Sequence, residues 1–182
     1  MVIAQSVHNP VFELVVKHLE VSAVELFEAY CMPARTVEAP RGESVPAAEP
    51  SILAVIGFVG EGARGALIMI AQESAVLAWL RLMGETGGDS ADVLGEFANM
   101  LLGRLKTRLL PEGLSLQVST PTTASGNLRL SAPPAFSKWL VVQGEGWELK
   151  VRLDATFERH FALREVAATE AAPAQAGEAI FF

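Results

Sequence analysis

Residues 92–109 read DVLGEFANMLLGRLKTRL, and the interpretation of the whole chain starts from this stretch. At about 100° per residue, its apolar side chains fill one broad arc of a helical wheel. The members of this arc are Leu94, Phe97, Ala98, Leu101, Leu102, Leu105 and Leu109. The spacing therefore predicts a helix that buries one face against the rest of a folded domain.

The opposite side of this helix carries a line of polar and small residues. The line consists of Asp92, Glu96, Asn99, Gly103 and Lys106. Steps of three and four residues keep its members on one side of a helix. Asn is a mediocre helix former, and Gly costs about 1 kcal/mol relative to Ala in a helix interior. We therefore interpret the line as a candidate binding surface, with an ordinary solvated face as the alternative.

A long helix is predicted near the start of the chain. Asn9-Pro10 is typical of a helix start, because Asn caps the helix and Pro suits the first helical position. Apolar residues then recur at helical spacing up to Met32, and Pro33 ends the helix. Residues 33–50 are rich in Pro, Ala, Glu and Arg, which predicts a solvated loop.

Strands are predicted on both sides of the quoted helix. Two apolar runs at 52–59 and 64–71 flank Gly60-Glu61-Gly62 and indicate a β-hairpin. A helix at 73–83 follows this hairpin. After Gly113 the apolar residues alternate with polar ones, and 139–143 and 147–157 flank a second turn, Gly144-Glu145-Gly146. This order predicts an α+β fold, a mostly antiparallel sheet with long helices packed on one face.

Composition limits the classes of protein that fit the chain. The 182 residues are 51% hydrophobic and carry a net charge of −7, which indicates a globular protein and argues against nucleic-acid binding. We predict one domain over residues 1–164, including the loop, and a flexible low-complexity tail over 165–182. No signal peptide or membrane span is apparent, so we expect a soluble, cytoplasmic protein without a membrane partner.

Disulfide and metal chemistry are not expected. Cys31 is the one cysteine, so no intrachain disulfide can form, and we expect a half-buried structural thiol. The histidines, His8, His18 and His160, are scattered without ligand spacing. The sequence therefore predicts no metal site of its own.

The stretch from Asp92 to Lys106 resembles the signature of the CheC/CheX/FliY chemotaxis phosphatases. That signature is Asp or Ser, three residues, Glu, two residues, Asn, and a Pro about 22 residues further on; Pro121 occupies this last place to within one residue. The segments Ile56–Gly60 and Arg64–Leu67 resemble the first hairpin of the family, and the likeness covers about residues 9–157. The chain has a single Glu/Asn motif, as CheX does, whereas CheC has two.

The resemblance implies a phosphatase, a hydrolase that acts on the aspartyl-phosphate of a CheY-like response-regulator receiver. Asn99 would enter the receiver's site and orient the attacking water, and Glu96 would pair with the receiver's active-site Lys. Such chemistry depends mostly on positioning and electrostatics. We expect no cofactor of the chain's own, because the receiver would supply Mg²⁺. The family likeness also implies a homodimer.

The remaining members of the motif have expected binding or supporting roles. Asp92 is either an interface residue or a stabiliser of the helix N-terminus. Gly103 would leave room for the partner, Lys106 is a partner contact or a solvated lysine, and Pro121 would support the helix from the next strand. Two other interpretations stay open: a non-catalytic adaptor that binds a receiver, and a dimeric scaffold in a signalling complex. The presence of both Glu96 and Asn99 favours the phosphatase.

Overall fold

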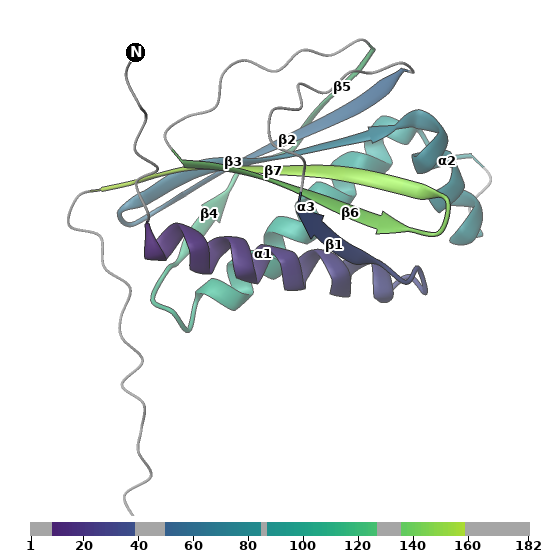
Figure 1. The fold of residues 1–182 in the computed structure, drawn as a ribbon. Helices are drawn as coiled ribbons and strands as arrows, with labels where there is room; N and C mark the ends of the chain where they lie inside the picture. The colour runs from purple at the N-terminus through teal and green to yellow at the C-terminus, as the bar shows by residue number, and fades with distance from the viewer. Residues whose placement is uncertain (1–8, 39–49, 85–86, 127–135, 159–182) are drawn as a thin grey trace, which may run out of the picture.

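The computed structural model describes residues 9–38, 50–84, 87–126 and 136–158. In this part of the chain, helices pack on one face of an antiparallel sheet (Figure 1). The helices are α1 (Pro10–Glu28), α2 (Glu73–Leu82) and α3 (Ser90–Leu109). The strands are β1 (Arg35–Glu38), β2 (Ser51–Gly60), β3 (Ala63–Gln72), β4 (Leu116–Val118), β5 (Thr122–Gly126), β6 (Phe136–Gly144) and β7 (Trp147–Phe157). The predicted α+β class with helices on one face is confirmed.

The described strands form one sheet in the order β1-β6-β7-β3-β2-β4, and β5 also pairs with β2. Both predicted hairpins are present. Gly60 pairs with Ala63 around a turn in which Gly62 has φ 73°, and Gly144 pairs with Trp147 around Gly146 at φ 75°. Glycine adopts these positive φ values without the steric cost that a side chain brings.

One edge of β2 is shared by two short strands. β4 pairs with its end and β5 with its beginning, and the chain between them leaves the ladder. Ser119 bridges this gap, since its N–H donates to the Gly57 carbonyl and its Oγ accepts from the Gly57 N–H, both at 2.9 Å. The strand β5, rich in Thr, Ser and Ala, was not predicted as a separate element.

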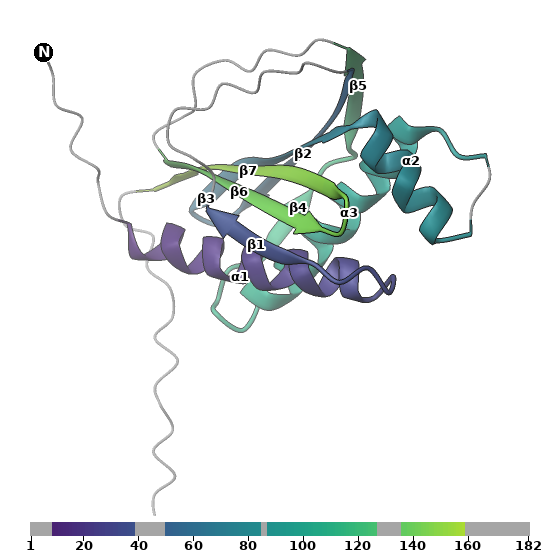
Figure 2. The same cartoon turned by 45° about the vertical axis from the view of Figure 1, so that its right-hand side comes forward.

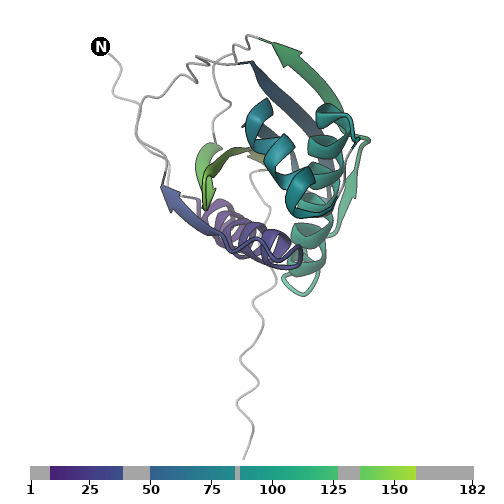
Figure 3. The same ribbon diagram turned by 90° about the vertical axis from the view of Figure 1, so that its right-hand side faces the viewer.

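The helices cover the sheet face on which Ile56, Leu67 and Leu153 lie. Figure 2 shows α1 running past β1, and Figure 3 shows α1 beside α3 with α2 nearer the viewer. A cluster of aromatic rings joins the three helices to β7, with neighbouring centroids 4.6–5.5 Å apart. Its members are Phe27, Trp79, Phe97 and Trp147. Burial of these rings fixes α3 in place.

The end of α1 differs from the prediction. The helix stops at Glu28, and Cys31 adopts the left-handed conformation (φ 57°) while the Met32 N–H donates to the Phe27 carbonyl. This is the geometry of a helix C-terminal cap. It turns Cys31 into solvent and buries Met32, so the prediction of a half-buried thiol is wrong.

The predicted loop over residues 33–50 contains a strand. β1 pairs with β6 from Arg35 to Glu38, so the loop prediction is wrong for these four residues. An edge strand can be held mainly by backbone hydrogen bonds, so it needs no apolar pattern. The short, mostly polar sequence of β1 therefore gave no signal of a strand. Residues 39–49 of that loop and the predicted tail lie outside the described residues. Among the helices that the structure describes, none is long and apolar enough to span a membrane.

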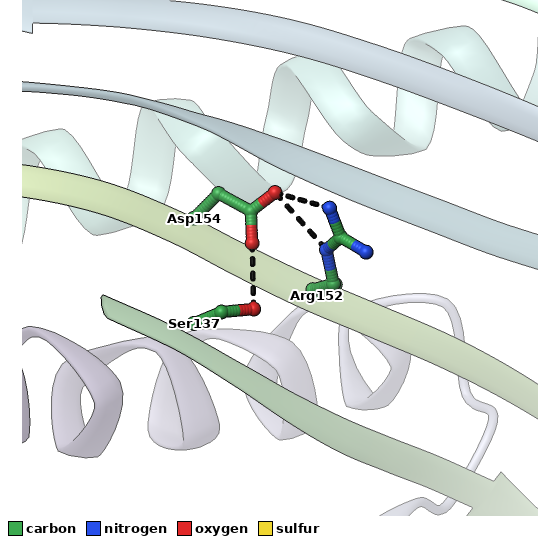
Figure 4. A network of polar contacts seen from close by, with 3 residues as sticks. All are labelled: Ser137, Arg152 and Asp154. Carbon is green, nitrogen blue, oxygen red and sulfur yellow. Dashed lines mark hydrogen bonds and ion pairs between the residues drawn. The ribbon is translucent and has the colours of Figure 1, made fainter. Parts of the chain in front are cut away.

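The sheet face away from the helices contains a buried ion pair on β7 (Figure 4). Arg152 Nε and Nη2 donate to Asp154 Oδ2 at 3.0 and 2.5 Å, and Ser137 Oγ donates to Asp154 Oδ1 at 2.7 Å. The guanidinium also lies 5.5 Å from the centroid of the Trp139 ring. Arg152 and Asp154 are only 6% and 8% exposed. Alternation of polar and apolar residues is typical of a strand with one solvated face, but this part of the face is buried.

Candidate functional site

Helix α3 presents the predicted line of residues to solvent. Asp89 caps the helix by accepting a hydrogen bond from the Ala91 N–H at 2.8 Å. The predicted apolar arc is buried, with every member at most 2% exposed. On the other side, Asp92, Glu96, Asn99 and Lys106 are exposed and Gly103 is half-buried. The helical spacing of the line is therefore confirmed, and the roles of its members stay predictions.

The centre of the line is a carboxylate and a carboxamide one turn apart. The side chains of Glu96 and Asn99 make no hydrogen bond or ion pair with another described residue. Asp92 lies four residues before Glu96, and like charges at this spacing destabilise a helix by a few tenths of a kcal/mol. Within the described part of the chain no polar contact holds these two exposed side chains, so they are accessible to another molecule.

Gly103 leaves the surface beside Asn99 open. A Cβ placed on Gly103 would meet no heavy atom within 4 Å outside the helix's own nearby backbone. Packing inside the protein therefore does not require glycine at this position. Because glycine also weakens a helix, the open space is consistent with close approach by a partner.

Pro121 lies against the flank of α3. A Cβ on Gly95 would be 3.8 Å from Pro121 Cγ and 3.2 Å from Thr123 Cγ2, so the helix approaches this edge of the sheet closely. Pro121 therefore lies close to α3, and its supporting role stays a prediction. Gly95 and Thr123 were not predicted to take part in this contact, although a second glycine within a helix is a signal of close packing.

The two glycines of α3 allow a matched test of this packing. Gly95→Leu should lower the free energy of unfolding by about 1–3 kcal/mol, because the larger side chain must displace β5 or Pro121. Gly103→Leu should leave it unchanged or raise it by up to about 1 kcal/mol, since a better helix former enters open space. Chemical denaturation measures both. Equal destabilisation by the two variants would contradict the close approach at Gly95.

The line is too long for all of its members to touch one phosphoryl group. At a rise of 1.5 Å per residue, Asp92 and Lys106 are each about 10 Å along the helix from Asn99. Glu96 and Gly103 are only about 5 and 6 Å along the helix from Asn99, so these three residues can flank a reaction site centred on Asn99. Asp92 and Lys106 can reach only its periphery.

A family model described as chemotaxis phosphatase CheX matches residues 52–143, just over half of the 182 residues. The chain belongs to the CheX family. The match includes α3 with its Glu/Asn motif and Pro121. A comparison with curated proteins finds no match.

Solved structures of CheX and its relatives have the same fold at low sequence identity. CheX from Vibrio vulnificus is 19% identical, with a TM-score of 0.66 over 78% of this chain and 96% of that chain. A CheC-like protein from a Shewanella species is also 19% identical, with a TM-score of 0.66 over 82% and 99% of the two chains. The CheX–CheY–BeF3–Mg²⁺ complex from Borrelia burgdorferi matches at 14% identity, with a TM-score of 0.59 over 78% and 97%.

This CheX-family chain has no cluster of metal ligands in the part that the structure describes. No group of three or more His, Cys, Asp or Glu side chains there is arranged to hold an ion. His18 lies near Glu112, with 3.5 Å between Nε2 and Oε1, on the side of α1 that faces the end of α3. Neither residue belongs to the polar line, and we assign neither to the site.

Proposed function

We propose that this CheX-family protein hydrolyses the aspartyl-phosphate of a CheY-like receiver domain in the cytoplasm, with Asn99 as the group that orients the attacking water. One observation carries the proposal. Glu96 and Asn99 project side by side from a helix whose other face is fully buried, and neither has a partner among the described residues. The family is described as a chemotaxis phosphatase, which supports phosphate hydrolysis as the reaction in which these two residues take part.

A carboxamide suits this chemistry. Its oxygen accepts a hydrogen bond from water, while its NH₂ can donate to a phosphoryl oxygen. Hydrolysis of a phosphoryl group needs a water placed in line with the breaking P–O bond, and the protein contributes mostly position and charge. A carboxylate inserted at the same place would bring negative charge toward an anion, so Asn99 is the better inserted group.

Glu96 has a different role in this proposal. Its carboxylate would pair with the active-site lysine of the receiver and thereby set the angle at which α3 approaches. That cation would also relieve the repulsion between Glu96 and Asp92 on the free protein. Glu96 therefore acts mainly in binding, while Asn99 acts in the chemical step.

The receiver would bring the metal ion. The structure of a relative from Borrelia burgdorferi is titled as a complex of CheX, CheY, BeF3 and Mg²⁺. We infer that Mg²⁺ in the present case belongs to the receiver and screens the phosphoryl charge as Asn99 enters. Asp92 and Lys106 would lie at the periphery of the contact, Gly103 would leave room for the partner beside Asn99, and Pro121 would support the helix from the next strand. A homodimer remains a prediction, which sedimentation equilibrium decides.

The activity is tested by incubating the protein with phosphorylated receiver domains encoded by the same organism. At one part protein to about a hundred parts receiver, we expect one or more receivers to lose phosphate faster than without the protein, with multiple turnovers per molecule. Phosphate release and the remaining phosphoprotein are both followed. Binding without acceleration would instead support the non-catalytic adaptor. The absence of both binding and acceleration would overturn the proposal.

A further inference from the structure

A shallow groove lies between α1 and α3, next to the Glu96–Asn99 pair. Its volume is about 630 Å³. The lining residues are Glu25, Met100, Gly103, Arg104, Thr107 and Arg108. Gly103 belongs to both this groove and the polar line, and Met100 directly follows Asn99. The α1–α3 groove therefore adjoins the polar line, and a partner that contacts Asn99 would also contact the groove.

The Met100 side chain forms the part of the groove nearest Asn99, and Tyr30 contacts it. The Tyr30 hydroxyl donates to Met100 Sδ at 3.2 Å, and the Tyr30 ring lies 5.4 Å from that of Phe97 in the aromatic core. This contact ties Met100 to the end of α1. Thioether side chains are polarizable and adapt to varied apolar groups. Met100 thus offers an apolar contact beside the site.

The other end of the α1–α3 groove is positively charged. Arg108 forms an ion pair with Glu25 across the two helices. Arg104 forms no ion pair with any described residue, so the lining carries one cation more than it has anions. The groove lining is thus positive, whereas the whole chain has a net charge of −7. Such a site attracts a carboxylate and repels a cation.

We propose that the α1–α3 groove is a second contact for the receiver, in which Arg104 binds a surface carboxylate while a neighbouring apolar side chain lies on Met100. The inference rests on the proposed function for the identity of the partner. A guanidinium can hold a carboxylate through two parallel hydrogen bonds, which fixes orientation as well as charge. Arg104 therefore helps to select the receiver and acts outside the chemical step.

The competing explanation is that Arg104 acts only through the net charge of the protein or through the stability of α3. Arg81 provides the matched control, because it is an exposed arginine in the last turn of α2 and away from the groove. Arg104→Glu and Arg81→Glu change the net charge equally. Arg81 lies in the last turn of α2 and Arg104 lies before the last turn of α3, so chemical denaturation of both variants measures what each substitution costs in stability.

The experiment measures steady-state kinetics with the receiver that the parent dephosphorylates, and affinity for the same receiver carrying BeF3 and Mg²⁺. Arg104→Glu should raise KM and Kd about tenfold or more, with kcat within about twofold of the parent. Arg104→Lys should recover part of the affinity, since it restores charge without the planar fork. Arg81→Glu should stay within about twofold of the parent in every parameter.

Three outcomes would overturn the inference. Unchanged KM and Kd for Arg104→Glu would remove the groove from the contact, and an equal loss in Arg81→Glu would assign the effect to overall charge. In both cases hydrolysis by the parent would leave the proposed function standing. If the parent binds no receiver at all, the proposed function and the groove contact fail together.

Discussion

Replacing Asn99 with alanine is expected to slow dephosphorylation of the receiver about 10²–10³-fold, the usual effect of removing one preorganised polar group from a reaction site. The loss should appear in kcat, because the amide acts on the water in the transition state more than on the bound receiver. Affinity for the receiver carrying BeF3 and Mg²⁺ should change little. Stopped-flow or radiolabel decay under single-turnover conditions measures the chemical step directly.

The structure makes this variant safe to interpret. The Asn99 side chain is exposed and has no partner among the described residues, and alanine is the better helix former, so folding should be unaffected. Asn99→Asp keeps the shape but loses the NH₂ donor and adds a negative charge, so it should be at least as slow. Glu96→Ala should weaken binding more than it slows the bound complex. Parent-like decay in Asn99→Ala would refute the assignment of Asn99.

The second large effect concerns stability. Asp154→Ala should lower the free energy of unfolding by about 3–5 kcal/mol, because it leaves the Arg152 guanidinium buried without its counter-ion. The contact with the Trp139 ring offsets only part of this cost. Urea denaturation, followed by far-UV circular dichroism and tryptophan fluorescence, measures the change. Helix α3 lies on the other face of the sheet, so the proposed phosphatase activity should persist in the folded fraction.

A matched control lies on the same strand. Glu148 pairs with Lys150 two residues away, as Asp154 pairs with Arg152, but its side chain is 46% exposed and the N–O distance is 3.9 Å. Glu148→Ala should therefore cost less than about 1 kcal/mol. The double variant Arg152→Met/Asp154→Leu should recover most of the loss, since apolar groups can replace a buried pair. Equal costs for Asp154→Ala and Glu148→Ala would contradict the importance of burial.

Much of the fold could be predicted from local signals. Capping by Asn9 and Asp89, the glycine turns at 60–62 and 144–146, and the apolar arc of α3 each depend on residues close together in sequence. β1 and β5 could not be predicted in this way. They are short edge strands without a strong apolar pattern, and they exist because a neighbouring strand offers backbone partners. The buried pair on β7 was missed because its alternating charges resemble a solvated face.

For the candidate site, as for the fold, local features could be predicted and long-range contacts could not. Helical spacing placed Glu96, Asn99 and Gly103 on one exposed side, and the family signature directed attention to them. The close approach at Gly95 and the contact between Tyr30 and Met100 join segments distant in the chain, so no local pattern reports them. The groove contains Arg104 and Arg108, and no pattern within the helix indicates that these two arginines lie beside Glu25 of α1.

Glu96 and Asn99 project from the convex surface of a helix, and a convex surface cannot enclose a small molecule. On the proposed function, the hollow in which hydrolysis occurs belongs to the substrate protein, and this chain supplies the projecting part. Selectivity for a receiver then depends on how well the surface around Asn99 fits the hollow of that receiver. Substitutions around Asn99 could redirect the protein to another receiver while Glu96 and Asn99 themselves remain unchanged.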